Sequence, residues 1–214
     1  MSIDFSKLKT KLEKLKPSLA QIQTPPTDDV IVSHRLIEDC DWTKLSAEAF
    51  EIDTSILKNV NLSDSIVPRV RIETAYLNAC NLSNVRCERP VLRKVVVANS
   101  KLTGLWATSG LFEDAMFESC RGEFALFCYS TLKRCVFRNC DLQEADFQEA
   151  DLRGVVFENC NLKELQLSGA KLEGADIRGS KIEGLRVDPS ALRGVIVDYT
   201  QAAYLATILG IIIR

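Results

Sequence analysis

The chain has 214 residues, of which 46% are hydrophobic and 26% are charged, and its formal net charge is -2. This composition excludes a disordered, collagen-like or membrane-spanning chain and fits a single globular domain. The nearly balanced charge provides no overall basic field for a nucleic-acid backbone, so we expect no direct binding of nucleic acid.

Two residue types limit the chemistry and the compartment. The single histidine, His34, disfavours a Ser-His-Asp triad, a Cys-His pair and a multi-histidine metal centre. The eight cysteines occur without a leader that has an apolar core and a small-residue cleavage site. We therefore expect a reduced, cytoplasmic protein that has neither a cofactor nor a bound metal.

The first predicted element is an amphipathic helix over residues 3–16. Four large apolar residues recur there at helical spacing among lysines: Phe5, Leu8, Leu12 and Leu15. Pro17 ends this helix, because proline cannot continue the backbone hydrogen bonding. Residues 21–29 form a linker, so residues 1–29 are expected to be a unit of helix and linker.

A five-residue repeat follows, from Val32 to Val197, without a shift of frame. Stepping by five visits large apolar residues throughout, with these exceptions: Ala47, Cys87, Ala107 and Gly122. A second column, two residues earlier, runs from Arg35 to Val195 and holds mainly Ala, Cys, Ser, Val and Leu. Two positions of every five are therefore predicted to point inward.

A period of five fits neither a strand nor a helix, so each pentapeptide must contain its own corner. Its last residue is often glycine, and the residue between the two inward columns is often Asp or Asn. These residue types tolerate left-handed and turn conformations. The sequence therefore predicts a solenoid of very short strands joined by tight turns.

Three segments show the repeat most clearly: residues 145–149 (ADFQE), 150–154 (ADLRG) and 175–179 (ADIRG). They resemble the pentapeptide repeat family, whose members read A-[DN]-L-x-x in tandem. The resemblance implies an all-β solenoid over residues 30–199, a right-handed quadrilateral β-helix with four pentapeptides per coil and about eight coils. Distorted coils are expected where the pattern is weak: Arg35, residues 46–50, Pro90 and Gly122.

Residues twenty apart should then stack on one face of the solenoid. Five cysteines share one inward column: Cys40, Cys80, Cys120, Cys140 and Cys160. Stacked coils hold side chains parallel at about 4.8 Å, so we interpret these cysteines as packed small residues rather than metal ligands. A disulfide between neighbouring coils is the alternative. Charges of opposite sign mostly alternate along the outer columns, as on a solvated face, although a charged recognition strip would look similar.

One outward column is apolar where polar residues are expected, and we call it the apolar strip: Leu36, Ile56, Tyr76, Val96, Met116, Val136, Val156 and Ile196. A strip about 40 Å long should not face water. Our hypothesis is that the N-terminal helix folds back onto it, and a helix rising about 1.5 Å per residue would cover half of it. A protein partner or a second subunit is the alternative, which makes the strip a candidate interface.

A smaller apolar cluster is predicted on another face. Its members are Ile66, Trp106 and Leu126, with Arg86 between the first two. A tryptophan beside an arginine is typical of a binding hot spot. A locally packed surface is the alternative interpretation.

After Val197 the five-residue register stops. Asp198 or Thr200 can cap a helix over residues 201–209, and Gly210 ends it, so residues 200–214 are expected to cap the solenoid. This C-terminus is similar to that of the bacterial Qnr and MfpA pentapeptide proteins, and the similarity implies a homodimer through the cap. The candidate dimer residues are Tyr204, Leu205, Ile208, Leu209, Ile211, Ile212 and Ile213.

The sequence carries no nucleophile with a base, no phosphate-binding glycine loop and no carboxylates in contrasting environments. An interior filled by Phe117, Phe137 and Phe157 should also leave no cavity for a small molecule. We therefore predict a non-enzymatic scaffold that binds an unknown protein partner through faces of the β-helix, without membrane contact. The alternative, implied by the Qnr and MfpA resemblance, is a DNA mimic that modulates DNA gyrase. Balanced charge and an uninterrupted register count against that alternative.

Overall fold

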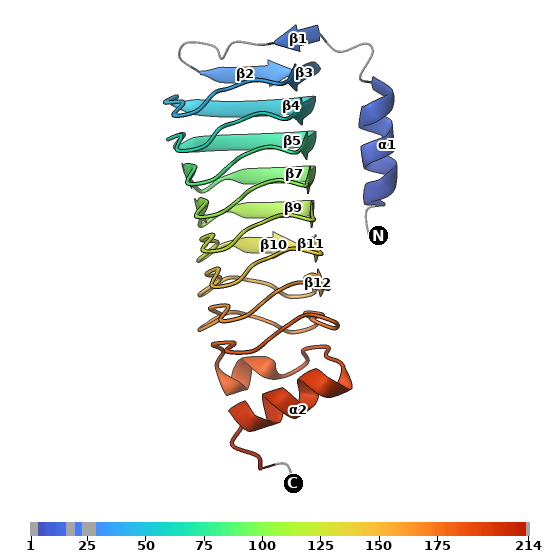
Figure 1. Ribbon diagram of the computed structural model, residues 1–214, viewed down its shortest axis with the longest axis vertical. Helices are drawn as coiled ribbons and strands as arrows, with labels where there is room; N and C mark the ends of the chain where they lie inside the picture. Colours follow the sequence, from blue (N-terminus) through green and yellow to red (C-terminus); the bar gives the residue numbers. More distant parts are fainter. Residues whose placement is uncertain (1–3, 16–19, 23–28, 213–214) are drawn as a thin grey trace.

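The computed structural model describes residues 4–15, 20–22 and 29–212. Its strands stack along one long axis as a solenoid, with α1 (Phe5–Leu15) lying alongside and α2 (Tyr199–Ile208) closing the far end (Figure 1). The protein is a parallel β-solenoid with a helix at each end of the chain.

Pairing in the solenoid joins residues twenty apart. This offset holds from the pair Val30 and Phe50 to the pair Asp176 and Ile196. The solenoid strands are β2 (Val30–Ser33), β3 (Arg35–Glu38), β4 (Ala49–Lys58), β5 (Arg69–Asn78), β6 (Arg86–Glu88), β7 (Val91–Ala98), β8 (Trp106–Thr108), β9 (Leu111–Glu118), β10 (Thr131–Lys133), β11 (Val136–Arg138) and β12 (Val156–Glu158). The short β1 (Ala20–Ile22) pairs with β3 at the N-terminal end. Four pentapeptides therefore form each coil, as the sequence predicts.

The corners of the coils lie at the last residue of each pentapeptide. From His34 to Gly194 this residue has a left-handed φ, except at Ala49, Arg69 and Pro189. Glycine holds some of these corners, but Asn, Asp, Ser, Lys and aromatic residues hold others. A left-handed residue with a side chain costs about 1–2 kcal/mol. Coil pairing therefore imposes the corner conformation even where the residue does not favour it.

The two inward columns form one continuous core. Polar members of these columns are satisfied by the backbone: Ser130 Oγ accepts a hydrogen bond from the Gly110 N–H at 2.9 Å and donates to the Ala107 carbonyl at 3.1 Å. All eight cysteines are free thiols. Burial raises the pKa of Cys80 to about 11, so its thiol is protonated at neutral pH.

Phenylalanines from two opposite faces fill the later coils. Phe117, Phe137 and Phe157 stack from coil to coil, with ring centroids 4.7 and 5.1 Å apart. Phe127 and Phe147 stack at 4.9 Å on the opposite face and meet the first column edge to face. Such offset and edge-to-face contacts add to the stabilisation from burial.

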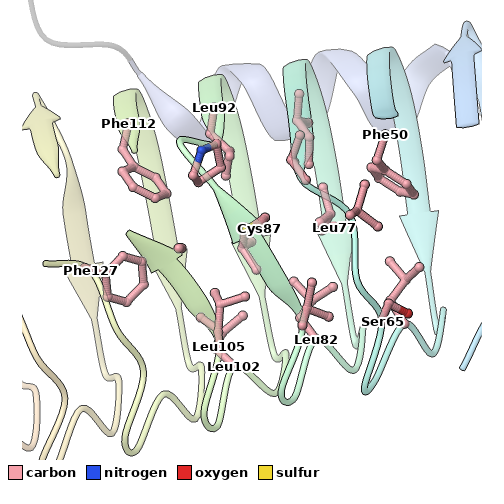
Figure 2. Close-up of a pocket in the computed structure, with 18 of the residues that line it drawn as sticks. Phe50, Ser65, Leu77, Leu82, Cys87, Leu92, Leu102, Leu105, Phe112 and Phe127 are labelled. Atoms are coloured by element: carbon pink, nitrogen blue, oxygen red, sulfur yellow. The ribbon is translucent and has the colours of Figure 1, made fainter. Parts of the chain in front are cut away.

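The earlier coils contain a cavity, so the prediction of an interior without one is wrong. Its volume is about 80 Å³, and it extends between Phe50 on one side and Phe112 and Phe127 on the other (Figure 2). In the three coils before Phe127, its column holds Ala107, Cys87 and Val67, and all three line the cavity. The cavity therefore results from small side chains at inward positions. It matches the volume of about two or three water molecules.

Helix α1 lies on the apolar strip. Leu12 is buried in a cluster with Leu36, Ile56, Tyr76, Val96, Ala98 and Met116, against which Phe5, Leu8 and Val136 also pack. In Figure 1 the helix runs beside the strand ends of the earlier coils, parallel to the long axis. Lys9 places its Nζ 5.3 Å from the centre of the Tyr76 ring. The helix begins and ends within the predicted residues 3–16, whose first and last members and Pro17 lie outside the described residues.

Helix α2 covers the C-terminal end of the solenoid. Asp198 caps the helix, and hydrogen bonds from the Thr200 hydroxyl and the Gln201 N–H lower the pKa of its carboxyl to about 2. Gln201 Nε2 donates to the Ile177 and Ser180 carbonyls at 2.6 and 2.7 Å. These contacts satisfy backbone groups that the last coil would otherwise leave unpaired.

Candidate protein interface

The apolar strip is a poor candidate for an interface over most of its length. Leu36, Ile56, Tyr76, Val96 and Met116 are buried beneath or beside α1. While α1 stays docked, the chain itself covers these residues, and their role as an interface stays a prediction. Beyond the helix, Val136 and Val156 are half-buried and Ile196 is exposed.

The candidate dimer residues at the C-terminus separate into two groups. Leu205 is buried, and Tyr204 and Ile208 are partly buried, all three against the core of the solenoid. One side of α2 covers the last coil, so Leu205 is not available to a second copy, and the dimer role of Tyr204 and Ile208 stays a prediction. Leu209, Ile211 and Ile212 are exposed and stay candidates, and Ile213 lies outside the described residues.

The third candidate surface is open to solvent. Ile66 is 53% exposed and Trp106 is 47% exposed, while Leu126 is half-buried. Backbone bridges join Ile66 to Arg86, Arg86 to Trp106 and Trp106 to Leu126, so the four residues occupy successive coils of one face. The Arg86 guanidinium lies over the Trp106 ring, 4.7 Å from its centre. The two side chains thus hold each other in place by a cation–π contact.

Two aromatic residues extend this surface. Phe124 and Tyr129 are 53% and 65% exposed and lie at the two corners that bound the face at Leu126. Their φ angles are +59° and +58°, a region that bulky residues rarely adopt. We call the set the Trp106 patch: Ile66, Arg86, Trp106, Phe124, Leu126 and Tyr129. Sequence reasoning missed the two corner aromatics, although a bulky aromatic in the corner column was a visible departure from the repeat.

The charged outer columns form ion pairs within the chain. Arg93 lies 3.4 Å from both Glu73 and Glu113, in the coils above and below it. Arg138 pairs in the same way with Glu118 and Glu158, at 3.7 and 2.6 Å. Partly exposed pairs of this kind contribute little stability each, but they oppose shifts in the pairing of coils. The charges held in these pairs are therefore less available to a partner.

The described residues show little that could support catalysis or metal binding. No group of three or more His, Cys, Asp and Glu side chains among them could hold a metal ion. Burial raises the pKa of the thiols of Cys87 and Cys135 to about 12, which keeps them protonated. In the part of the chain that the structure describes, no helix is long and apolar enough to cross a membrane.

The repeat and its coil geometry define a class of solenoid built from pentapeptides. A family model described as "Pentapeptide repeat region" matches residues 111–187 and 130–203. Residues 111–203 of the chain are therefore similar to the pentapeptide repeat family. This result confirms the family that the sequence resembles.

Individual relatives are more distant. "Uncharacterized protein YisX" of Bacillus subtilis (strain 168) is 27% identical over 108 residues, which is 50% of this chain and 51% of YisX. The match thus spans about half the length of that relative. A trypsin-treated variant of QnrB1, described as a plasmid-mediated fluoroquinolone resistance protein, is 18% identical with a TM-score of 0.39, covering 91% of this chain and 94% of that one. HetL of Nostoc sp. strain PCC 7120, described as involved in regulating heterocyst differentiation, is 16% identical with a TM-score of 0.40, covering 83% and 86%.

Proposed function

We propose that this protein is a non-enzymatic scaffold that binds another protein through the Trp106 patch. The observation that carries the proposal is the exposure of Trp106, Phe124 and Tyr129 around Arg86 on one face of a rigid solenoid. Tryptophan, tyrosine and arginine dominate the binding energy of many interfaces. A cluster of exposed aromatics on a soluble domain is typical of an interaction site. The pentapeptide repeat fold fits such a role, because its parallel coils hold surface side chains at fixed spacing.

The test compares three forms of the intact protein in pull-downs from cells of its source. The forms are the unchanged protein, Trp106→Ala and a control, Ile31→Ala, which alters an exposed isoleucine outside the patch. We expect a partner that the first and third forms retain and that Trp106→Ala loses by about tenfold or more. Equal recovery of the same proteins by all three forms would show that the patch is not the binding surface.

A homodimer through the C-terminus is the second part of the proposal. It is supported by three exposed apolar residues beyond the capped coil: Leu209, Ile211 and Ile212. Apolar residues of this size gain free energy when a second copy covers them. Sedimentation should show a monomer for Ile211→Asp and a dimer for the control Ile31→Asp. A monomer for the unchanged protein would contradict the dimer.

Modulation of DNA gyrase by mimicry of DNA is the alternative that the resemblance to Qnr and MfpA implies. The charge distribution supports the scaffold instead. A DNA mimic needs a row of unpaired negative charges, whereas Glu73 and Glu113 pair with Arg93, and Glu118 and Glu158 pair with Arg138. A gyrase supercoiling assay, with and without a fluoroquinolone, tests the alternative directly.

A further inference from the structure

The arginines of this chain differ in whether a carboxylate accompanies them. Seven described arginines lie within 4.0 Å of a carboxylate: Arg71, Arg93, Arg134, Arg138, Arg153, Arg178 and Arg186. Six described arginines form no such pair: Arg35, Arg69, Arg86, Arg89, Arg121 and Arg193. Four of these six, all but Arg35 and Arg193, lie in or beside the Trp106 patch. Unpaired guanidinium groups are thus concentrated around the exposed aromatics.

The unpaired cations lie on both sides of the patch. Arg69 and Arg89 are one coil apart and belong to the corner column that also holds Tyr129. Lys101 and Arg121 are joined by a backbone bridge on the adjoining face, and Lys101 also forms no ion pair with a described carboxylate. All four side chains are exposed. Like charges stacked in neighbouring coils repel each other, so each pair opposes folding slightly.

The carboxylates of this region do not neutralise these cations. Glu123 accepts a hydrogen bond from the Thr103 hydroxyl at 2.9 Å, and Asp141 accepts one from Asn161 at 2.9 Å. Glu88 is exposed and lies beyond 4.0 Å from any cationic nitrogen of the described residues. The apolar centre of the patch therefore has free positive charge on these two sides, while Glu144, Asp146 and Glu149 lie in the next coil on its C-terminal side.

We infer that the occupant of the patch is a protein segment that carries carboxylates beside apolar or aromatic side chains. This inference rests on the proposed scaffold function and specifies the partner's chemistry. Apolar side chains of the segment would contact Trp106, Phe124 and Tyr129, and its carboxylates would accept hydrogen bonds from the surrounding guanidinium groups. An apolar centre within a charged rim is the usual anatomy of a protein interface. Stacking on Trp106 also fixes the Arg86 plane while its N–H groups stay free for a bidentate carboxylate.

A single-stranded nucleic acid fits these observations less well. Such ligands need aromatic rings for stacking and a groove that is positive throughout. Here the aliphatic side chains of Ile66 and Leu126 occupy the same face, and Glu88 and Glu123 would repel a phosphate backbone. Nucleic acid is therefore an outcome to be tested rather than the proposed ligand.

The experiment selects ligands from a phage library of random dodecapeptides on the intact protein, with competition by unlabelled protein. The binding of selected peptides is then measured by fluorescence anisotropy at low and at about physiological salt. We expect enrichment of Asp and Glu together with Leu, Phe or Trp. Trp106→Ala should weaken binding about tenfold or more. The double variant Arg89→Gln and Arg121→Gln should weaken it about fivefold and flatten its salt dependence. The control Arg71→Gln should leave binding unchanged.

The outcomes separate this inference from the function on which it rests. The selected peptides could lack acidic enrichment, and their binding could depend on Trp106 but not on Arg89 or Arg121. That result would overturn the proposed partner chemistry and leave the scaffold function standing. Selected peptides that bind equally to Trp106→Ala would overturn both. Tighter binding of oligothymidine than of any peptide, lost in Trp106→Ala, would replace the proposed segment by a nucleic acid.

Discussion

The N-terminal coils (residues 30–110) and the C-terminal coils (residues 111–197) solve the same packing problem with different residues. Both place side chains inward at the same two positions of each pentapeptide. The C-terminal coils fill the centre with stacked phenylalanines. The N-terminal coils bury Trp42 and Phe50 but otherwise use mainly aliphatic and small residues, and they retain a cavity of about 80 Å³. The five-residue period thus fixes which side chains point inward, and the size of those side chains decides how well the centre of each coil is filled.

The corners and the outer faces differ in the same way. Corner glycines gather in the C-terminal coils, from Gly154 to Gly194, while Gly104 is the corner glycine of the N-terminal coils. The longest strands, β4 and β5, begin at Ala49 and Arg69, the N-terminal corners without a left-handed φ. Helix α1 covers the N-terminal coils on the outside. The family model begins at residue 111, where the pattern becomes regular. The C-terminal coils are therefore stabilised by their own interior packing. The N-terminal coils are stabilised also by helix α1, which packs on their outer face.

The largest effect should come from the phenylalanine column. Phe137 is fully buried and contacts four other rings, so Phe137→Ala should lower the free energy of unfolding by about 4 kcal/mol. The matched change in the N-terminal coils, Leu77→Ala beside the cavity, should cost about 2 kcal/mol. Urea unfolding measures both. Equal losses of unfolding free energy in the two variants would show that the N-terminal and C-terminal coils do not differ in how tightly they are packed.

The next effect concerns the outer layer. Leu12→Asp should undock α1, because it replaces a buried leucine by a carboxylate, and should cost about 2–3 kcal/mol. An environment-sensitive dye should then bind the uncovered strip, and hydrogen exchange should rise in β4, β5 and β7 but not in β11 and β12. The control is Lys11→Asp, at an exposed position of the same helix. Unchanged exchange in β4 and β5 would argue that docking contributes nothing to the N-terminal coils.

Corner chemistry should give a smaller effect. Gly154 has φ +70° and no neighbouring atom within 4 Å of an added Cβ, so Gly154→Ala should cost about 1 kcal/mol from backbone conformation alone. The converse change in the N-terminal coils, Lys94→Gly at φ +53°, should stabilise by about 0.5 kcal/mol. Thermal unfolding of both variants provides the measurement. If Gly154→Ala left the stability unchanged, the pairing of coils rather than the corner residue would determine the cost of a left-handed φ.

Filling the cavity should raise stability slightly. Ala107 lines the cavity, so Ala107→Val should increase the free energy of unfolding by about 0.5–1 kcal/mol. The same change at Ala145, which is fully buried in the phenylalanine-filled coils, should instead cost about 1–2 kcal/mol through overpacking. Urea midpoints of the two variants should therefore move in opposite directions. A shift in the same direction would contradict the difference in interior filling.

Thiol reactivity should distinguish surface from interior without a change in stability. Cys128 is half-buried, and burial together with the nearby Asp146 raises the pKa of its thiol to about 11. At pH values below that pKa, the fraction of reactive thiolate therefore rises about tenfold for each unit by which the pH is raised. In the folded protein, Cys128 should react with a disulfide reagent at a rate that rises from pH 7 to pH 10, and Cys87 should react only on unfolding. Cys128→Ser should abolish the fast phase, and a plateau near pH 8 would contradict the raised pKa.

The fold was largely predictable because the five-residue period is a local property. A large apolar residue every five positions specifies which side chains point inward, and glycine at the last position of the pentapeptide marks corners that are left-handed. The Asp and Asn between the inward columns, such as Asp41 and Asn61, instead form β-bridges between coils. The cavity is not evident from the column of Phe117, Phe137 and Phe157 alone. The opposite column holds Val67, Cys87 and Ala107, and their combined small volume matters only when two facing columns are compared.

The five-residue period alone specifies the coil and which side chains point inward, and it shows that apolar residues also occur on the outside. The tertiary structure decided which of those residues stay exposed. Leu36 and Met116 differ little from Ile66 in chemistry, but α1 covers the first two and leaves the third in solvent. It also decided that Phe124, Tyr129 and the unpaired cations surround Trp106. The physical reason is that residues distant in the chain become neighbours only through the twenty-residue offset between coils and the corner between adjoining faces.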